Sequence, residues 1–173
     1  MRVHTRADKA MIQVALGKPV TPEQLLSLAD HSLGSWCRSI WTVLRLTRAF
    51  DRGGAHQAEQ LLSHLPSKIS PSASSLHDVQ VLHARKDAMR LKAWLALLLG
   101  DRLCFASSFA ICGGLRQLGY PCFVEVGYEY IHQYTQTPFH AYVVYEGEIV
   151  NDFPDMRASY VPFLWYGKKG EQP

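Results

Sequence analysis

Hydrophobic side chains recur every three or four residues through the first hundred positions, which is the spacing of one face of an α-helix. The pattern predicts a helical stretch from Pro22 to about Phe50, in which Gly34 is a candidate break, and a short helix over residues 55–65. A Pro- and Ser-rich stretch over residues 66–75 is expected to be a linker, and residues 76–99 again follow the helical pattern. We therefore expect a helical N-terminal region.

Beyond Gly100 the pattern changes. Residues 105–118 form an apolar run of helical length that a glycine ends, whereas residues 122–128 alternate with the period of two that is typical of a β-strand. Two further strands are predicted over residues 141–145 and 148–152, joined by a tight Glu-Gly turn. This order predicts an α+β fold, in which one helix packs on an antiparallel sheet.

Composition and charge narrow the class of protein. The chain has 173 residues, of which 47% are hydrophobic and 19% charged, so one compact domain with an appendage is expected, with a disordered tail over residues 167–173. The net charge is +3, but Lys and Arg are scattered, which argues against a nucleic-acid partner. The most apolar segment, residues 93–99, is too short to span a membrane, and no signal peptide is evident. We expect a cytoplasmic protein.

The four cysteines have to be considered one at a time, because no C-x-x-C pair or zinc-type His spacing links them and a cytoplasmic setting disfavours disulfides. Cys37, Cys112 and Cys122 lie in apolar stretches and are interpreted as packed core residues. Cys104 begins the apolar helix, where unpaired N–H groups and the helix dipole lower the pKa of a thiol. The same N–H groups could form an oxyanion hole. A lone cysteine is nevertheless more often a small buried residue.

Two further residues complete a pattern for nucleophilic catalysis. His140 opens a predicted strand, from which an imidazole could take the proton of Cys104, although a surface histidine is an equal alternative. Asp152 returns on the next strand, and because adjacent strands lie about 4.8 Å apart its carboxylate could orient the imidazole. Asn151 should point to the opposite face, and Asp155 lies outside the strand. The three residues predict a Cys-His-Asp triad that needs no metal or cofactor.

Several separate segments between residues 100 and 163 carry a family resemblance. They are Cys104-Phe-Ala-Ser-Ser-Phe-Ala, Leu115-Arg-Gln-Leu-Gly-Tyr-Pro leading into Val124-Glu-Val-Gly, His140-Ala-Tyr-Val-Val, and Gly147-Glu-Ile-Val-Asn-Asp-Phe-Pro-Asp-Met-Arg. These segments resemble the leader peptidases of lasso-peptide biosynthesis, which are transglutaminase-like cysteine proteases. The resemblance implies a papain-like or transglutaminase-like core over residues 100–166, with Cys104 as nucleophile, His140 as base and Asp152 as orienting residue.

The resemblance also implies a substrate and partners. The substrate would be a ribosomally made precursor peptide, whose leader is removed so that a lasso cyclase can close the core peptide. Residues 1–99 match the family only loosely and contain no convincing hairpin of a recognition domain, so we expect a separate small leader-recognition protein and a docking role for these helices.

Two residues are candidates for contact with the substrate. They are His132, in a polar loop, and Tyr142, where many relatives have Trp. Two alternative functions stay open, namely amide transfer by the same triad and a catalytically silent scaffold of the maturation complex.

Overall fold

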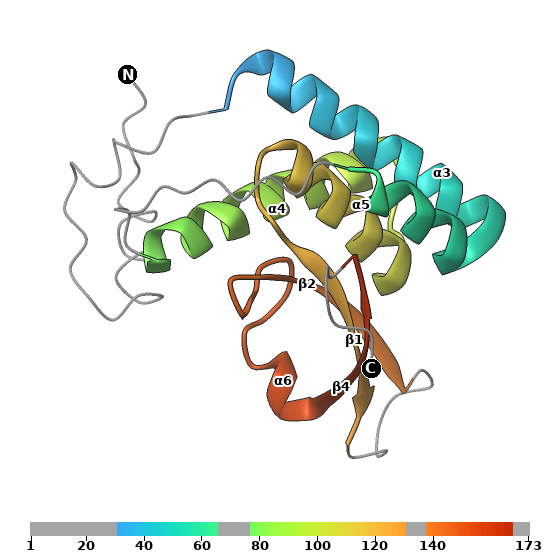
Figure 1. The fold of residues 1–173 in the computed structure, drawn as a ribbon, viewed down its shortest axis with the longest axis vertical. Helices are drawn as coiled ribbons and strands as arrows, with labels where there is room; N and C mark the ends of the chain where they lie inside the picture. The colour runs from blue at the N-terminus through green and yellow to red at the C-terminus, as the bar shows by residue number, and fades with distance from the viewer. Residues whose placement is uncertain (1–30, 66–76, 131–137, 168–173) are drawn as a thin grey trace.

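The computed structural model describes residues 31–65, 77–130 and 138–167. Its elements in chain order are α3 (Leu33–Ser63), α4 (His77–Leu99), α5 (Cys104–Gln117), β1 (Phe123–Glu129), β2 (Phe139–Tyr145), β3 (Glu148–Ile149), α6 (Met156–Ser159) and β4 (Tyr160–Tyr166). The long helices gather in the upper half of Figure 1 and the sheet fills the lower half. The fold is therefore α+β with a helical N-terminal region, as the order of the patterns predicted.

The sheet has four antiparallel strands in the order β3-β2-β1-β4. Three strands were expected, and the fourth, β4, lies at the edge beside β1. β3 is shorter than predicted. Val150 still donates its N–H to the carbonyl of Val143, but the N–H of Val143 bonds to the side chain of Asn151 instead of a backbone carbonyl. The side-chain oxygen of Asn151 thus takes the place of a backbone acceptor in the β2–β3 pairing, and the strand ends.

The first described helix differs from its prediction at Gly34. Ser32 caps α3 by accepting the N–H of Ser35 at 3.2 Å, so Gly34 lies in the first turn and does not divide the helix. The interruption expected near residue 54 is a kink within α3, where Gly53 and Gly54 have non-helical backbone angles. The predicted start at Pro22, the linker over residues 66–75 and the tail beyond Gly167 lie outside the described residues.

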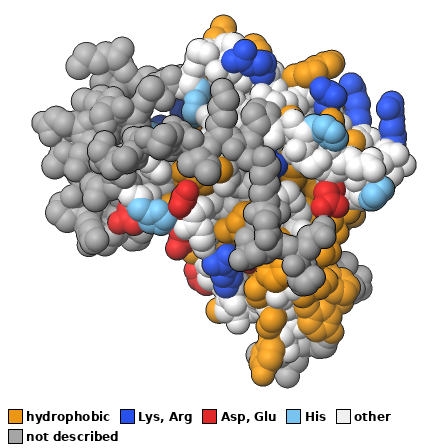
Figure 2. Space-filling view, viewed as in Figure 1, with side chains coloured by type: hydrophobic (Ala, Val, Ile, Leu, Met, Phe, Trp, Pro, Cys, Tyr) orange, Lys and Arg blue, Asp and Glu red, His pale blue; other side chains and the backbone are white. Residues whose placement is uncertain are grey.

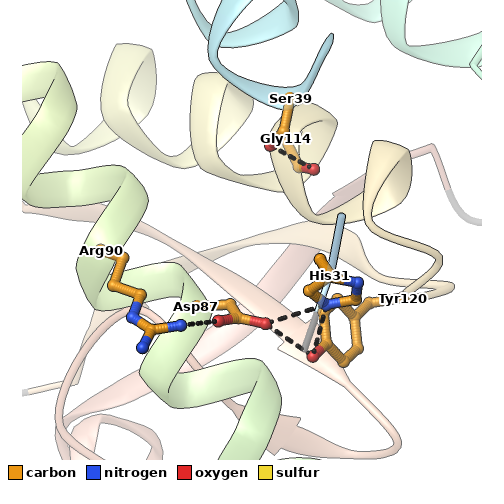
Figure 3. Close-up of polar contacts among 6 residues, drawn as sticks. All are labelled: His31, Ser39, Asp87, Arg90, Gly114 and Tyr120. Carbon is orange, nitrogen blue, oxygen red and sulfur yellow. Dashed lines mark hydrogen bonds and ion pairs between the residues drawn. The ribbon is translucent and has the colours of Figure 1, made fainter. Parts of the chain in front are cut away.

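Two adjacent glycines let α5 approach its helical neighbours closely. A Cβ on Gly113 would lie 2.0 Å from Cδ1 of Leu46 in α3, and one on Gly114 would lie 2.8 Å from Cδ1 of Leu91 in α4. Ser39 of α3 also donates its hydroxyl to the carbonyl of Gly114 at 2.8 Å (Figure 3). One hydrophobic core therefore includes residues of α3, α4, α5 and the sheet.

A buried arginine fixes the other end of α5. The guanidinium of Arg116 donates Nε to the carbonyl of Cys122 at 2.9 Å and Nη1 to the carbonyl of Leu62 at 3.0 Å, and Nη2 donates to the carbonyl of Gly167. These carbonyls belong to the approach to β1, the end of α3 and the end of β4. One side chain thereby joins these three parts of the chain to the end of α5.

A second polar junction lies on α4 (Figure 3). The carboxylate of Asp87 is 5% exposed and accepts hydrogen bonds from Tyr120 Oη at 2.8 Å, His31 Nε2 at 3.1 Å and Arg90 Nη1 at 3.1 Å. Although burial alone would raise it, the pKa of Asp87 lies below its ordinary value because of these partners. The junction links the residue before α3, helix α4 and the turn after α5. No helix in the part of the chain that the structure describes is long and apolar enough to cross a membrane.

Candidate active site

Cys104 is the first residue of α5, and its neighbours favour the ionised thiol. Leu103, the N-cap residue, has extended backbone angles and makes no side-chain capping bond. The partial burial of Cys104 alone would raise the pKa of its thiol. Hydrogen bonding to His140 and to the backbone of Ala141 and Phe105, together with the charge of His140, outweighs burial, so the pKa of Cys104 lies below its ordinary value of 9.0.

His140 and Asp152 meet near the start of β2. The Nε2 atom of His140 lies 2.9 Å from Oδ2 of Asp152, and both side chains are less than one-fifth exposed. The other carboxylate oxygen of Asp152 accepts the backbone N–H of Phe153 at 2.9 Å. Val150 brings this segment back to β2 through its bond to Val143. Both oxygens of the carboxylate are therefore held.

The charges of the three residues reinforce one another. The hydrogen bond to Asp152, followed by that to Cys104, raises the pKa of His140 to about 9 from 6.5. The hydrogen bond to His140 in turn lowers the pKa of Asp152. Because the pKa of the base rises while that of the thiol falls, the arrangement favours a thiolate beside an imidazolium ion. Such a pair provides a nucleophile and a proton donor in one site.

The rival orienting residues lie elsewhere. Asn151 is buried and uses its side chain structurally: Oδ1 accepts the N–H of Val143 at 2.6 Å, and Nδ2 donates to Ser108 Oγ at 3.1 Å. Ser108 donates in turn to the carbonyl of Ala141 at 2.7 Å. This chain of bonds fastens β2 to α5 beside the catalytic candidates. Asp155 is exposed and precedes α6. The carboxylate bonded to His140 is that of Asp152.

Of the two residues predicted to contact the substrate, only Tyr142 lies in the described part of the chain. Tyr142 is fully buried, with its ring centroid 6.2 Å from that of His140, so it packs against the base and is not open to a substrate in this structure. This corrects the expectation that it lines the substrate site, because His140 and Tyr142 belong to one face of β2, which packs over a small second core. His132 lies outside the described residues.

Two of the other three cysteines are buried, as predicted, and one is not. Cys112 and Cys122 are buried, and their sulfur atoms lie 3.6 Å apart. Cys37, expected in the core, is exposed, because the buried face of α3 is formed by Ser39, Val43 and their neighbours. Cys104 is neither fully exposed nor fully buried. Within residues 31–65, 77–130 and 138–167, no group of three or more His, Cys, Asp or Glu side chains is arranged to hold a metal ion.

Sequence reasoning missed Tyr160, whose ring lies 5.3 Å from the imidazole of His140. The chain carries no local signal for this contact, because it depends on a strand that the pattern did not reveal. An exposed row of rings adjoins the same region: Tyr128 and Phe139 lie 5.3 Å apart, and Phe139 and Phe163 lie 5.6 Å apart. Figure 2 shows hydrophobic side chains gathered on the surface around the sheet.

Compared with known proteins, the chain matches no family model, no curated protein and no solved structure.

Proposed function

We propose that this protein is a cysteine peptidase that removes the leader from a lasso-peptide precursor through Cys104, His140 and Asp152. The observation that carries the proposal is the 2.9 Å contact between His140 Nε2 and Asp152 Oδ2, on an imidazole that also interacts with the thiol of Cys104. A thiol, a base and an orienting carboxylate from three separate segments form the arrangement that thiol-based acyl transfer requires. The core is then transglutaminase-like.

The proposed reaction proceeds through a thioester. The thiolate of Cys104 attacks the carbonyl carbon of the peptide bond, and the carbonyl electrons move to the oxygen, which backbone N–H groups at the start of α5 stabilise. The imidazolium of His140 gives its proton to the leaving nitrogen as the carbon–nitrogen bond breaks, which releases the new amine of the core peptide. Asp152 keeps the imidazole oriented throughout.

Hydrolysis of the thioester completes the cycle. Neutral His140 takes a proton from water, whose oxygen attacks the thioester carbon. The carbon–sulfur bond then breaks, which restores the thiolate and the imidazolium, and the leader leaves with a new carboxylic acid that gives its proton to solvent. If an amine attacks in place of water, the same site transfers the acyl group.

The substrate and partners in this proposal come from the sequence resemblance. The precursor would be presented by a separate small recognition protein, and the product would pass to a lasso cyclase. The four segments that carry the resemblance include all three site residues, in the same chain order.

The test uses the full chain together with a lasso-peptide precursor and a small leader-recognition protein as the probes. Mass spectrometry should find free leader and core with the wild type and with Cys37→Ala, which removes an exposed cysteine, but not with Cys104→Ala. Cleavage that persists in Cys104→Ala would contradict the mechanism and favour a scaffold. An amine-linked, uncleaved product would favour amide transfer.

A further inference from the structure

An aromatic ring covers part of the base in the candidate site. Tyr160, the first residue of β4, has its ring centroid 5.3 Å from that of His140, with 36° between the ring planes. The ring of Tyr142 lies 6.2 Å from the same imidazole. His140 therefore has an aromatic neighbour that is fully buried and another, Tyr160, that is only partly buried.

The backbone of β1 leaves room for the ring of Tyr160. Gly127 pairs with His140 across the β1–β2 ladder, and a Cβ built on Gly127 would lie 2.7 Å from Cβ of Tyr160. Gly127 does not have a positive φ, so its backbone conformation does not call for glycine. The register of β1 with β4 also shifts at this glycine. The close approach of Tyr160 thus explains why residue 127 is a glycine.

The peptide group that joins Ser159 to Tyr160 is anchored through both its carbonyl and its N–H. The carbonyl of Ser159 accepts the N–H of Tyr130 at 3.0 Å, and the N–H of Tyr160 bonds to the carbonyl of Met156. Burial raises the pKa of Tyr160, and the charges of Glu129, Cys104 and Asp152 raise it further. Those last two charges belong to the candidate site, so the neutral phenol ring lies within electrostatic range of the nucleophile and the orienting residue.

We infer that Tyr160 is a positioning residue, whose ring shields the His140–Asp152 hydrogen bond from water and holds the imidazole toward Cys104. A hydrogen bond between charged groups is stronger where water is excluded, and a packed ring has fewer orientations than a free one. The ring, and not the hydroxyl, provides this effect. The inference rests on the proposed function only in its expected effect on peptide cleavage, and the effect on the thiol is independent of it.

Thiol chemistry tests the inference without a substrate. The rate at which iodoacetamide alkylates Cys104 is measured against pH in a Cys37→Ser background, because Cys112 and Cys122 are buried. Removal of the ring in Tyr160→Ala should move the midpoint of thiol ionisation upward by about one pH unit, the size expected when one ordinary hydrogen bond is lost. Tyr160→Phe should keep the wild-type midpoint.

Gly127→Ala provides an independent variant, because it retains Tyr160 but pushes its ring away. Its midpoint should shift as in Tyr160→Ala, and the double variant should shift no further than either single one. If Tyr160→Ala does not fold, as judged by circular dichroism, Tyr160→Val keeps a strand-forming residue, lacks the ring and should give the same shift. An unchanged midpoint in the folded ring-less variant, or an equal shift in Tyr160→Phe, would overturn the inference.

Peptide cleavage separates this inference from the proposed function. In the precursor assay, Tyr160→Ala should lower kcat about tenfold with little change in KM, and Tyr160→Phe should restore it. A shifted alkylation midpoint in a protein that cleaves no precursor would uphold the positioning role and refute the peptidase. Normal cleavage with an unshifted midpoint would refute only the positioning role.

Discussion

The charge on Cys104 depends on a relay of contacts in which each residue stabilises the next. Phe153 donates its N–H to Asp152, Asp152 bonds to His140, and His140 interacts with the thiol. Because the pKa of His140 is about 9, the imidazole is protonated at neutral pH and attracts the thiolate. The negative charge of Asp152 is the end of this relay. Removal of this charge should therefore raise the pKa of the Cys104 thiol, although no bond joins the two residues directly.

Asp152→Asn tests this relay at the scale of single residues. The substitution keeps the shape of the side chain but removes its charge, so the pKa of His140 should fall from about 9 toward 6.5. Nuclear magnetic resonance of the imidazole against pH measures that change directly. Precursor cleavage at neutral pH should fall by about two to four orders of magnitude. Asp155→Asn, in an exposed neighbour, serves as the control, and an unchanged His140 titration in Asp152→Asn would contradict the relay.

At the scale of elements, α5 is fixed by contacts on several sides. Gly113 and Gly114 let α3 and α4 pack closely against it, while Ser108 and Asn151 fasten it to β2. Cys104 is the first residue of this helix, so small movements of α5 would change the distance between its sulfur and His140. The tight helical packing therefore contributes to the geometry of the candidate site as well as to stability.

Gly113→Ala should destabilise the protein, even though alanine is more favourable than glycine within a helix by about 1 kcal/mol. The added methyl group would lie 2.0 Å from Leu46 Cδ1 and 3.2 Å from Thr42 Cγ2, so α3 and α5 must separate. Overpacking of this kind costs about 1–3 kcal/mol in the free energy of unfolding, which urea denaturation measures. Gly34→Ala is the matched control, since its nearest neighbour lies 3.9 Å away. It should be neutral or stabilising, and equal effects in both variants would contradict this explanation.

The elements that the sequence predicted well carry clear boundary signals. Gly100, with a φ of 74°, and Gly119, with a φ of 99°, bound the segment that contains α5, and these two glycines were sufficient to locate it. β4 was missed because residues 160–166 are apolar almost throughout and include Pro162, which hides the period of two. α6 is a single turn with no periodicity. The candidate residues Cys104, His140 and Asp152 lie beside recognisable boundaries, whereas the contact of Tyr160 depends on β4, which the sequence pattern did not reveal.

At the scale of the whole molecule, the helices and the sheet act as one body around α5. The hydrophobic core draws on α3, α4, α5 and three strands, so the N-terminal helices support the segment that carries Cys104. Polar junctions connect the same parts at the periphery: Arg116 of α5 donates to backbone carbonyls of three other segments, and Asp87 of α4 accepts hydrogen bonds from three side chains. Removal of either junction should lower the free energy of unfolding, although both junctions lie at a distance from the candidate site.

Asp87→Asn tests such a junction through the pH dependence of stability. The pKa of Asp87 in the folded protein lies below 3.8, so the folded state binds fewer protons than the unfolded state as the pH falls through that range. The contribution of Asp87 is thus complete well above pH 3.8 and is lost on acidification. At pH 7, Asp87→Asn should lower the free energy of unfolding in urea by about 2–4 kcal/mol.

The difference between the wild type and Asp87→Asn should shrink as the pH is lowered through the carboxylate titration, because the wild type then also lacks the charge. Asp51→Asn is the control: its carboxylate is 44% exposed and pairs with Arg102 at 3.1 Å, so its loss should cost less than about 1 kcal/mol. A difference between the wild type and Asp87→Asn that stays constant from pH 7 to acid would mean that the charge of Asp87 contributes nothing. The junction would then act by shape alone.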